Sequence, residues 1–248
     1  MGIDPRRAIF DEIRAAARPG LFNDQGNILA LDNLLDAFDV PRPAPDGYKL
    51  HDPNAFFRSV RLTFGSMSQL QIDSINGILA AATQHPIGWV AYELATGWHE
   101  ARFEPVDEIG KGRGRPYSKP GARMKAMDNP PTYGGQIPYG RGLVQLTWCD
   151  NYEWADAACA AAGLIAKGEI LADFDLVKRP DLAAFILVHG METGAFTGKG
   201  LADYLPGRLP AFSQFVNARR IVNGTDKAQL IAGYADQFAD ALDRGRWA

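Results

Sequence analysis

The sequence predicts a mainly α fold (α+β, with at most a small β element). Apolar residues recur at helical spacing in several segments, and this spacing gives a helix one apolar face. The clearest stripe repeats every four residues and consists of Leu230, Tyr234, Phe238 and Leu242. No segment alternates apolar and polar residues over the length of a strand, although 140–147 has room for a short one. With 248 residues, 46% of them hydrophobic, the chain is long enough to bury a large core.

The first part of the chain contains a weak internal repeat. Residues 9–38 and residues 56–82 each predict a short aromatic helix, a glycine-led turn and a second helix. The two second helices carry matching apolar positions, which are Ile28, Leu31, Leu34 and Leu35 in one and Ile72, Ile75, Ile78 and Leu79 in the other. A chance likeness between two ordinary helical hairpins explains this similarity equally well, because a repeat with only two copies is weak evidence.

A linker is predicted between the two copies. The stretch PRPAPDGYKLHDPN (41–54) is rich in proline and polar residues. We therefore divide the chain into a small N-terminal helical module, residues 1–50, and a main domain, residues 51–248.

Further helices are predicted in the main domain, at 87–100, 151–162 and 181–189. Pro105 is expected to end the first of them, because proline inside a helix costs about 3 kcal/mol. The last helix is expected to begin at an N-cap on Thr225 or Asp226. Residues 110–141 lack periodicity and are rich in Gly, Pro, Lys and Arg, and a connection of this length is usually functional or mobile.

Composition argues against several classes of protein. Lys and Arg number 26 against 29 Asp and Glu, so the net charge is −3, whereas a generally basic nucleic-acid-binding domain has a pI above about 9. No apolar run reaches the roughly 18 residues that suggest a membrane span. Cys149 and Cys159 are too few for a disulfide scaffold and are interpreted as buried thiols. No zinc-site spacing is present. We expect no metal, no cofactor, no nucleic-acid partner and no membrane insertion.

The long loop carries a run of basic residues with no acid among them. Its members are Lys111, Arg113, Arg115, Lys119, Arg123 and Lys125. Such a run is either a solvated loop or a surface that attracts an anionic polymer. It lacks the interleaved aromatic residues of a platform for single-stranded nucleic acid.

A cluster of carboxylates precedes this run. Glu100, Glu104 and Glu108 lie at intervals of four residues, and Asp107 is next to Glu108. Glu100 ends an apolar helix near Trp98 and Phe103, whereas Glu108 begins the loop. An apolar environment keeps a carboxyl protonated and a solvated environment lets it ionise. Glycosidic cleavage requires such a difference, with one acid to protonate the leaving oxygen and one base to activate water. A solvated charged face is the alternative interpretation.

Three separate motifs then resemble family 19 glycoside hydrolases, and most closely their phage and prophage branch, the chitinase-like endolysins. In chain order they are AYELATGWHEARFEP, YGRGLVQLTWCDNY and VNARRIVNGTDKAQLIAGYADQF. The resemblance runs from about Phe56 to Leu242. It implies a lysozyme-like, mainly α fold of two lobes around a substrate cleft. It also implies inverting hydrolysis of β-1,4-linked N-acetylhexosamine polymers.

The resemblance implies roles for individual residues. Glu100, in the His-Glu pair, matches the general acid, and Thr147, which ends the GRG…QL motif, matches the residue that positions the attacking water. The matched substrate-binding positions are Tyr139, Gln145, Asn151 and Asn223. Gly140 and Gly142 are expected to let the backbone approach a sugar closely. Relatives usually have Thr directly after the acid, where this chain has Ala101.

The general base is predicted to be Glu108, because it follows a Phe-Glu-Pro segment as the second glutamate of the family does. Asp107 and Glu104 stay open as alternatives. Inversion predicts that the two carboxyl groups lie about 6.5–9.5 Å apart, with room for water between them.

The function expected from these features is that of an endolysin, a glycosidase that cleaves peptidoglycan and works as a monomer. A chitinase is the alternative within the same class, and a non-catalytic wall-binding or virion structural protein is the alternative from another class. The N-terminal stretch MGIDPRRAIFDEIRAAARPG interleaves charges where a signal peptide needs an apolar core. We therefore expect synthesis in the bacterial cytoplasm and action on the cell wall after release. Residues 1–50 are either a wall-binding module or a stabilising extension.

Overall fold

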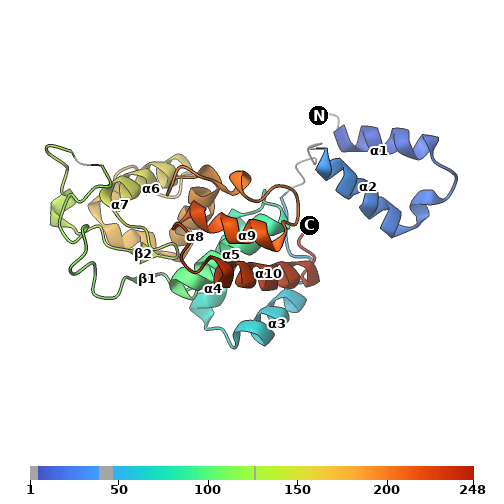
Figure 1. Cartoon of the computed structure of the whole chain (residues 1–248). Helices are drawn as coiled ribbons and strands as arrows, with labels where there is room; N and C mark the ends of the chain where they lie inside the picture. The colour runs from blue at the N-terminus through green and yellow to red at the C-terminus, as the bar shows by residue number, and fades with distance from the viewer. Residues whose placement is uncertain (1–4, 39–46, 126) are drawn as a thin grey trace.

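The computed structural model describes residues 5–38, 47–125 and 127–248, and this part of the chain is mostly helical (Figure 1). Helix accounts for 56% and strand for 3%, which confirms the mainly α prediction. The α-helices are α1 (Pro5–Ala16), α2 (Gln25–Ala37), α3 (Pro53–Phe64), α4 (Gln69–Ala81), α5 (Ile87–Ala101), α6 (Cys149–Ala161), α7 (Glu169–Ala172), α8 (Pro180–Thr193), α9 (Phe212–Ala218) and α10 (Ala228–Arg244). Short 3-10 helices are η1 (Leu21–Asn23), η2 (Tyr133–Gly135), η3 (Phe174–Lys178), η4 (Leu201–Asp203) and η5 (Arg219–Ile221). Among the described residues, no helix combines the length and apolar character that crossing a membrane requires.

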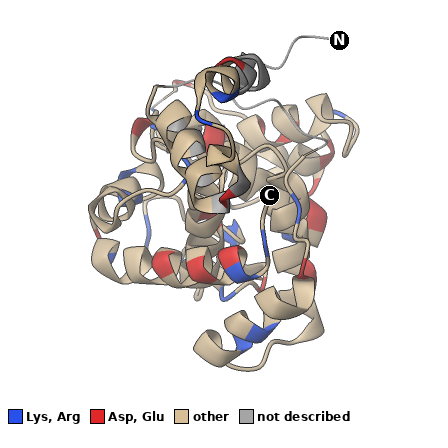
Figure 2. Cartoon of the chain, turned by 90° about the vertical axis from the view of Figure 1, so that its right-hand side faces the viewer, with Lys and Arg blue, Asp and Glu red and all other residues tan. Residues whose placement is uncertain are grey.

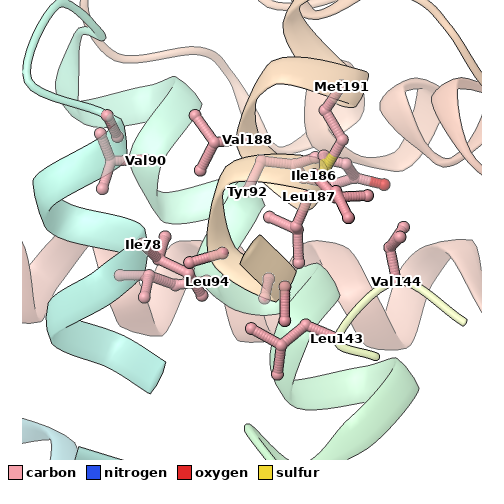
Figure 3. Packing of buried hydrophobic residues seen from close by; sticks show 14 of the residues in the cluster. Ile78, Val90, Tyr92, Leu94, Leu143, Val144, Ile186, Leu187, Val188 and Met191 are labelled. Carbon is pink, nitrogen blue, oxygen red and sulfur yellow. The ribbon is translucent and has the colours of Figure 1, made fainter. Parts of the chain in front are cut away.

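Helix α5 lies at the centre of the core. Helices α10, α4 and α8 pack around it, α10 most extensively. Val90 and Leu94 of α5 are fully buried, and Figure 3 shows them in one apolar cluster with Ile78 of α4 and Leu187 of α8. Burying each such side chain contributes about 1.5–3 kcal/mol, so this cluster is a main source of the stability of the fold.

The C-terminal end of α5 is set by an aromatic side chain rather than by proline. The helix ends at Ala101, because Arg102 and Phe103 take φ values of 52° and 60°. Phe103 is fully buried and packs against Trp98 and the edge of Phe238. Burial of its ring offsets the roughly 1–2 kcal/mol that a left-handed residue costs. The helix predicted at 87–100 is therefore confirmed, but it stops before Pro105 can act on it.

A two-stranded antiparallel sheet follows, made of β1 (Val106–Asp107) and β2 (Arg141–Gly142). An isolated bridge between Arg141 and Leu146 continues it, which confirms the short strand predicted within 140–147. The chain between β1 and β2 forms the predicted long loop, drawn in green beside α6 and α7 in Figure 1.

The last helix, α10, starts later than predicted. Its N-cap is Lys227, with φ of 56°, so the predicted cap on Thr225 or Asp226 is wrong. The carbonyl of Asp226 instead accepts a hydrogen bond from Nε of Arg219 at 3.0 Å. Helix α10 thus begins only after this bonded turn is complete.

The N-terminal helices differ from the helix pair that they resemble in sequence. In α2, Leu31 and Leu35 are buried, but Ile28 and Leu34 are 39% and 51% exposed. The matching helix α4 buries Ile75, Ile78 and Leu79 against the rest of the core. Whether residues 1–50 bind the cell wall stays a prediction.

The second half of the predicted linker, residues 47–54, is bound to the rest of the chain. Part of the linker, 41–46, lies outside the described residues. From residue 47 on, Tyr48 N–H donates to Thr83 O at 2.5 Å, and Leu50 forms a bridge with Trp247. The indole N–H of the buried Trp247 donates to His85 O at 3.1 Å. Both ends of the main domain therefore meet next to the start of α5.

A buried ion pair lies beneath this junction. His85 Nδ1 is 2.7 Å from Oε1 of Glu93, and both side chains are almost completely enclosed. Burial lowers the pKa of His85, but the hydrogen bond and negative charge of Glu93 outweigh burial and raise the pKa overall. The folded pair therefore holds a proton at pH values where an unfolded histidine has lost it, whichever of the two side chains carries it.

This extra proton predicts a pH-dependent stability. The contribution of the pair is fully present below about pH 6.5, the ordinary pKa of histidine, and is lost as the pH rises through the raised pKa. We expect the free energy of unfolding, measured by urea denaturation, to fall as the pH rises above about 6.5. Glu93→Gln should flatten this slope, whereas His51→Gln, at an exposed histidine, should not. Equal slopes for all three proteins would contradict the assignment.

Candidate active site

One pocket of about 360 Å³ brings together side chains from distant parts of the chain. Glu100 reaches it from the end of α5, the turn 144–148 follows β2, and Asn151 lies on α6. The loop residues Tyr117 and Met124 form another wall, and Asn223 follows η5. Five predicted site residues line this pocket: Glu100, Gln145, Thr147, Asn151 and Asn223.

Glu100 is held by a buried arginine. Its Oε1 accepts a hydrogen bond from Nη1 of Arg219 at 2.6 Å, and the Glu100 side chain is 18% exposed while that of Arg219 is 2% exposed. Trp98 and Phe103, the apolar residues expected near Glu100, pack with each other and with further aromatic residues of the core. A guanidinium therefore fixes the position of this carboxyl.

Arg219 is a site residue that the sequence analysis missed. The only signal was its place in the motif VNARRIVNG, where two arginines stand together. Arg220 bonds to Asn217 at the surface, whereas Arg219 points into the core. Burial lowers the pKa of the neighbouring His99, Glu100 raises it, and the charge of Arg219 lowers it further, so the net shift is downward.

The turn after β2 is tightly hydrogen-bonded. Thr147 Oγ1 donates to the carbonyl of Gln145 at 2.8 Å, and Asn151 Nδ2 donates to the carbonyl of Thr147 at 2.7 Å. The side chain of Gln145 donates to the carbonyls of Val106 and Gly142, both at 3.2 Å. Gln145 lines the pocket, but its amide N–H₂ group ties the turn to both strands.

Glu108 does not line the pocket. Its Oε1 accepts a hydrogen bond from the hydroxyl of Tyr117 at 2.7 Å, and its Oε2 accepts one from the N–H of Gly140 at 3.2 Å. Burial, together with the hydrogen bond and charge of Glu108, raises the pKa of Tyr117 to about 12. Tyr117 therefore stands between Glu108 and the pocket.

The two alternative bases are also absent from the lining. Asp107 lies 2.8 Å from Nζ of Lys178 and 3.1 Å from Nζ of Lys111. Burial raises the pKa of Asp107, but the hydrogen bonds from these two lysines outweigh it and lower the pKa overall. Glu104 follows the end of α5, where its N–H donates to Ala101 O.

Tyr139 is buried beside the site instead of lining it. The guanidinium of Arg141 lies 3.5 Å from the centre of its ring. Arg141 also donates to Asp175 at 2.8 Å, to the carbonyls of Ile137 and Tyr139, and to the hydroxyl of Tyr152. Tyr139 thus supports the chain that carries the pocket.

The loop wall of the pocket is fixed to α6. Arg123 bonds to Asp150 and Glu153, and the hydroxyl of Tyr133 donates to Glu153. The ring of Tyr117 meets Trp148 edge-on, with ring centres 5.3 Å apart. These contacts hold the long loop, although much of it is exposed.

Within the described ranges 5–38, 47–125 and 127–248, no group of three or more His, Cys, Asp and Glu side chains is arranged to hold a metal ion. Comparisons with protein-family models, with curated proteins and with solved structures found no match. The proposal for the function therefore rests on the residues of the pocket and their chemistry.

The glycines of the second motif pack against the chain itself. Gly142 has φ of +79°, and a Cβ on it would lie 2.9 Å from the carbonyl oxygen of Val177. A Cβ on Gly140 would lie 3.0 Å from Oε1 of Gln145. Close packing within the protein explains both glycines without a sugar.

Gly142→Ala is predicted to destabilise the protein by about 2–4 kcal/mol, because strained backbone and a clash with a carbonyl add together. Gly110→Ala is the matched control, since its φ is +81° but nothing lies within 4 Å of the added Cβ. The control should lose only about 1–2 kcal/mol, the cost of the left-handed conformation. Urea denaturation of both variants measures the difference, and equal losses would show that the contact with Val177 is unimportant.

Proposed function

We propose that the protein is a glycoside hydrolase that cleaves β-1,4 bonds in the glycan strand of peptidoglycan. The observation that carries this proposal is the pocket, in which a carboxyl, a hydroxyl and two amide side chains meet from separate segments: Glu100, Thr147, Asn151 and Asn223. Amides and hydroxyls offer donors and acceptors together, which suits the N-acetyl and hydroxyl groups of amino sugars. We further propose that the helices form two lysozyme-like lobes around this pocket.

In the proposed reaction, Glu100 gives a proton to the leaving glycosidic oxygen. The buried guanidinium of Arg219 stabilises the carboxylate that remains. Thr147 uses its hydrogen for the carbonyl of Gln145, so the lone pairs of its oxygen are available to accept a hydrogen bond from the attacking water. The water then attacks the anomeric carbon from the opposite face, which inverts its configuration.

Glu108 is the proposed base that takes the proton of this water. The hydroxyl of Tyr117 bonds to Oε1 of Glu108 and stands between this carboxylate and the pocket, so it has to move aside before Glu108 can act. Catalytic hydrogen bonds commonly rearrange when substrate binds. The two hydrogen bonds that Glu108 accepts favour, as a second candidate, a protein that binds the wall glycan without cleaving it.

Glu100→Gln is predicted to abolish turnover while the protein still binds its substrate. Loss of a general acid lowers the rate about 100-fold or more. The wild type and the variant are incubated with isolated peptidoglycan and with a chitin oligosaccharide, and new reducing ends are read by mass spectrometry. Cleavage of chitin alone would move the assignment to a chitinase. A wild type that forms no reducing end on either substrate would favour the non-catalytic binder.

The base is assigned by three further variants: Glu108→Gln, Asp107→Asn and Glu104→Gln. Loss of the base should lower kcat about 100-fold or more and leave KM nearly unchanged, because the base acts on water rather than on the sugar. We expect this result for Glu108→Gln alone. Circular dichroism and urea denaturation check that each variant is folded. A larger loss of kcat in Asp107→Asn would transfer the role to Asp107, whose ion pairs would then serve catalysis.

A further inference from the structure

The loop between β1 and β2 carries cations with different surroundings. Lys111 lies 3.1 Å from Asp107, and Arg123 is held between two acids of α6. Arg113, Arg115 and Lys119 are exposed, and no ion pair joins them to a carboxylate in the part of the chain that the structure describes. We call these three residues the cationic rim.

The cationic rim lies next to one residue of the pocket wall in the chain. Arg113 and Arg115 precede Tyr117, which lines the pocket, by four and two positions, and Lys119 follows it by two. Arg115 lies close enough to lower the pKa of the Tyr117 hydroxyl, against the larger effects of burial and of Glu108. The positive charge of Arg115 therefore reaches Tyr117, a residue of the pocket wall.

The rim is held by successive turns. The N–H groups of Arg113 and Arg115 donate to the carbonyls of Gly110 and Gly112 at 3.0 and 2.9 Å, and Ser118 N–H donates to Arg115 O at 3.0 Å. A Cβ on Gly112 would lie 3.2 Å from the ring of Tyr117, so the turn packs closely against the pocket wall. The backbone under the rim is thus ordered before a ligand arrives, which lowers the entropy cost of binding.

The loop from 111 to 125 contains six basic residues and no acidic one. On the side of the molecule shown in Figure 2, acidic and basic segments are interspersed along the helices. The pocket itself contains a single charged lining residue, Glu100. Neutral sugar rings suit the pocket, and anionic groups suit the rim beside it.

We propose that Arg113, Arg115 and Lys119 select a glycan that carries carboxylates as substituents, such as a peptide-substituted strand, over a neutral N-acetylhexosamine polymer. This inference rests on the proposed function and names the substrate class of the same pocket. Exposed ion pairs are individually weak, and three of them together change binding by about tenfold. A nucleic acid fits less well, because Tyr117 is the one aromatic residue between 110 and 125 and its ring packs on Trp148.

The test compares two triple variants with the same change in net charge. Arg113→Gln/Arg115→Gln/Lys119→Gln removes the rim. Arg58→Gln/Arg61→Gln/Arg244→Gln removes three exposed arginines from α3 and α10, away from the pocket. The substrates are isolated peptidoglycan, the same peptidoglycan with its carboxylates converted to neutral amides, and a chitin hexasaccharide. The readout is kcat/KM from new reducing ends.

We expect the rim variant to lose about tenfold in kcat/KM on native peptidoglycan and to match the wild type on the two neutral substrates. Added salt should lower the wild-type value on native peptidoglycan toward that of the rim variant. The control variant should behave as the wild type on all three. An equal loss on neutral and acidic substrates, or an equal loss in the control variant, overturns the proposal.

A binding measurement separates this proposal from the proposed function. The fraction of protein that sediments with native and with amidated peptidoglycan is measured in the Glu100→Gln background, with and without the rim changes. If the wild type forms no reducing end, the glycosidase assignment fails, but rim-dependent sedimentation with native peptidoglycan still supports carboxylate recognition. Unchanged sedimentation of the rim variant refutes it, whether or not the wild type is an enzyme.

Discussion

The burial of α5 is the constraint on which most of this structure depends. The helix passes through the centre of the core, and an uncompensated charge there is costly, so its carboxylates need partners. Glu93 has His85, and Glu100 has Arg219. The first pair lies where both ends of the main domain meet, and the second lies at the pocket. One buried helix thereby links the closure of the domain with the position of the candidate acid.

The irregular chain around the pocket also needs partners for its polar groups, in this case for backbone N–H and C=O groups. Buried backbone groups outside helices and strands must still find hydrogen-bond partners. Arg141 supplies them for the carbonyls of Ile137 and Tyr139. Two glutamines bind the irregular chain to its neighbours: Gln145 donates to one carbonyl in each strand, and Gln136 donates to the carbonyls of α7 and accepts from the N–H of Phe174. These bonds let a segment with almost no regular structure form a defined wall.

Local patterns predicted the helices well, because a long apolar stripe is legible within one segment. The helix at 87–100 and the last helix are examples. The predictions were wrong where residues that are distant in the sequence determine the local structure. The cap of α10 depends on Arg219, which takes the carbonyl of Asp226, and the apolar stripe of α2 is partly exposed although it matches the buried stripe of α4. In the candidate site, the motifs led to five residues that share one pocket, whereas Tyr139 and Glu108 lie behind its lining. Arg219 was hidden because two neighbouring arginines look alike in sequence.

The sequence by itself determined the helical class, the place of the long loop, the charge of that loop and the residue types available for chemistry. These properties follow from composition and from spacing along the chain. Only the tertiary structure decided which carboxyl is paired with which cation, which of two adjacent arginines is buried, and which loop cations have no carboxylate partner among the described residues. Hydrogen bonds and ion pairs form between groups that lie a few ångströms apart in space, and here Glu100 and Arg219 are 119 positions apart in the chain.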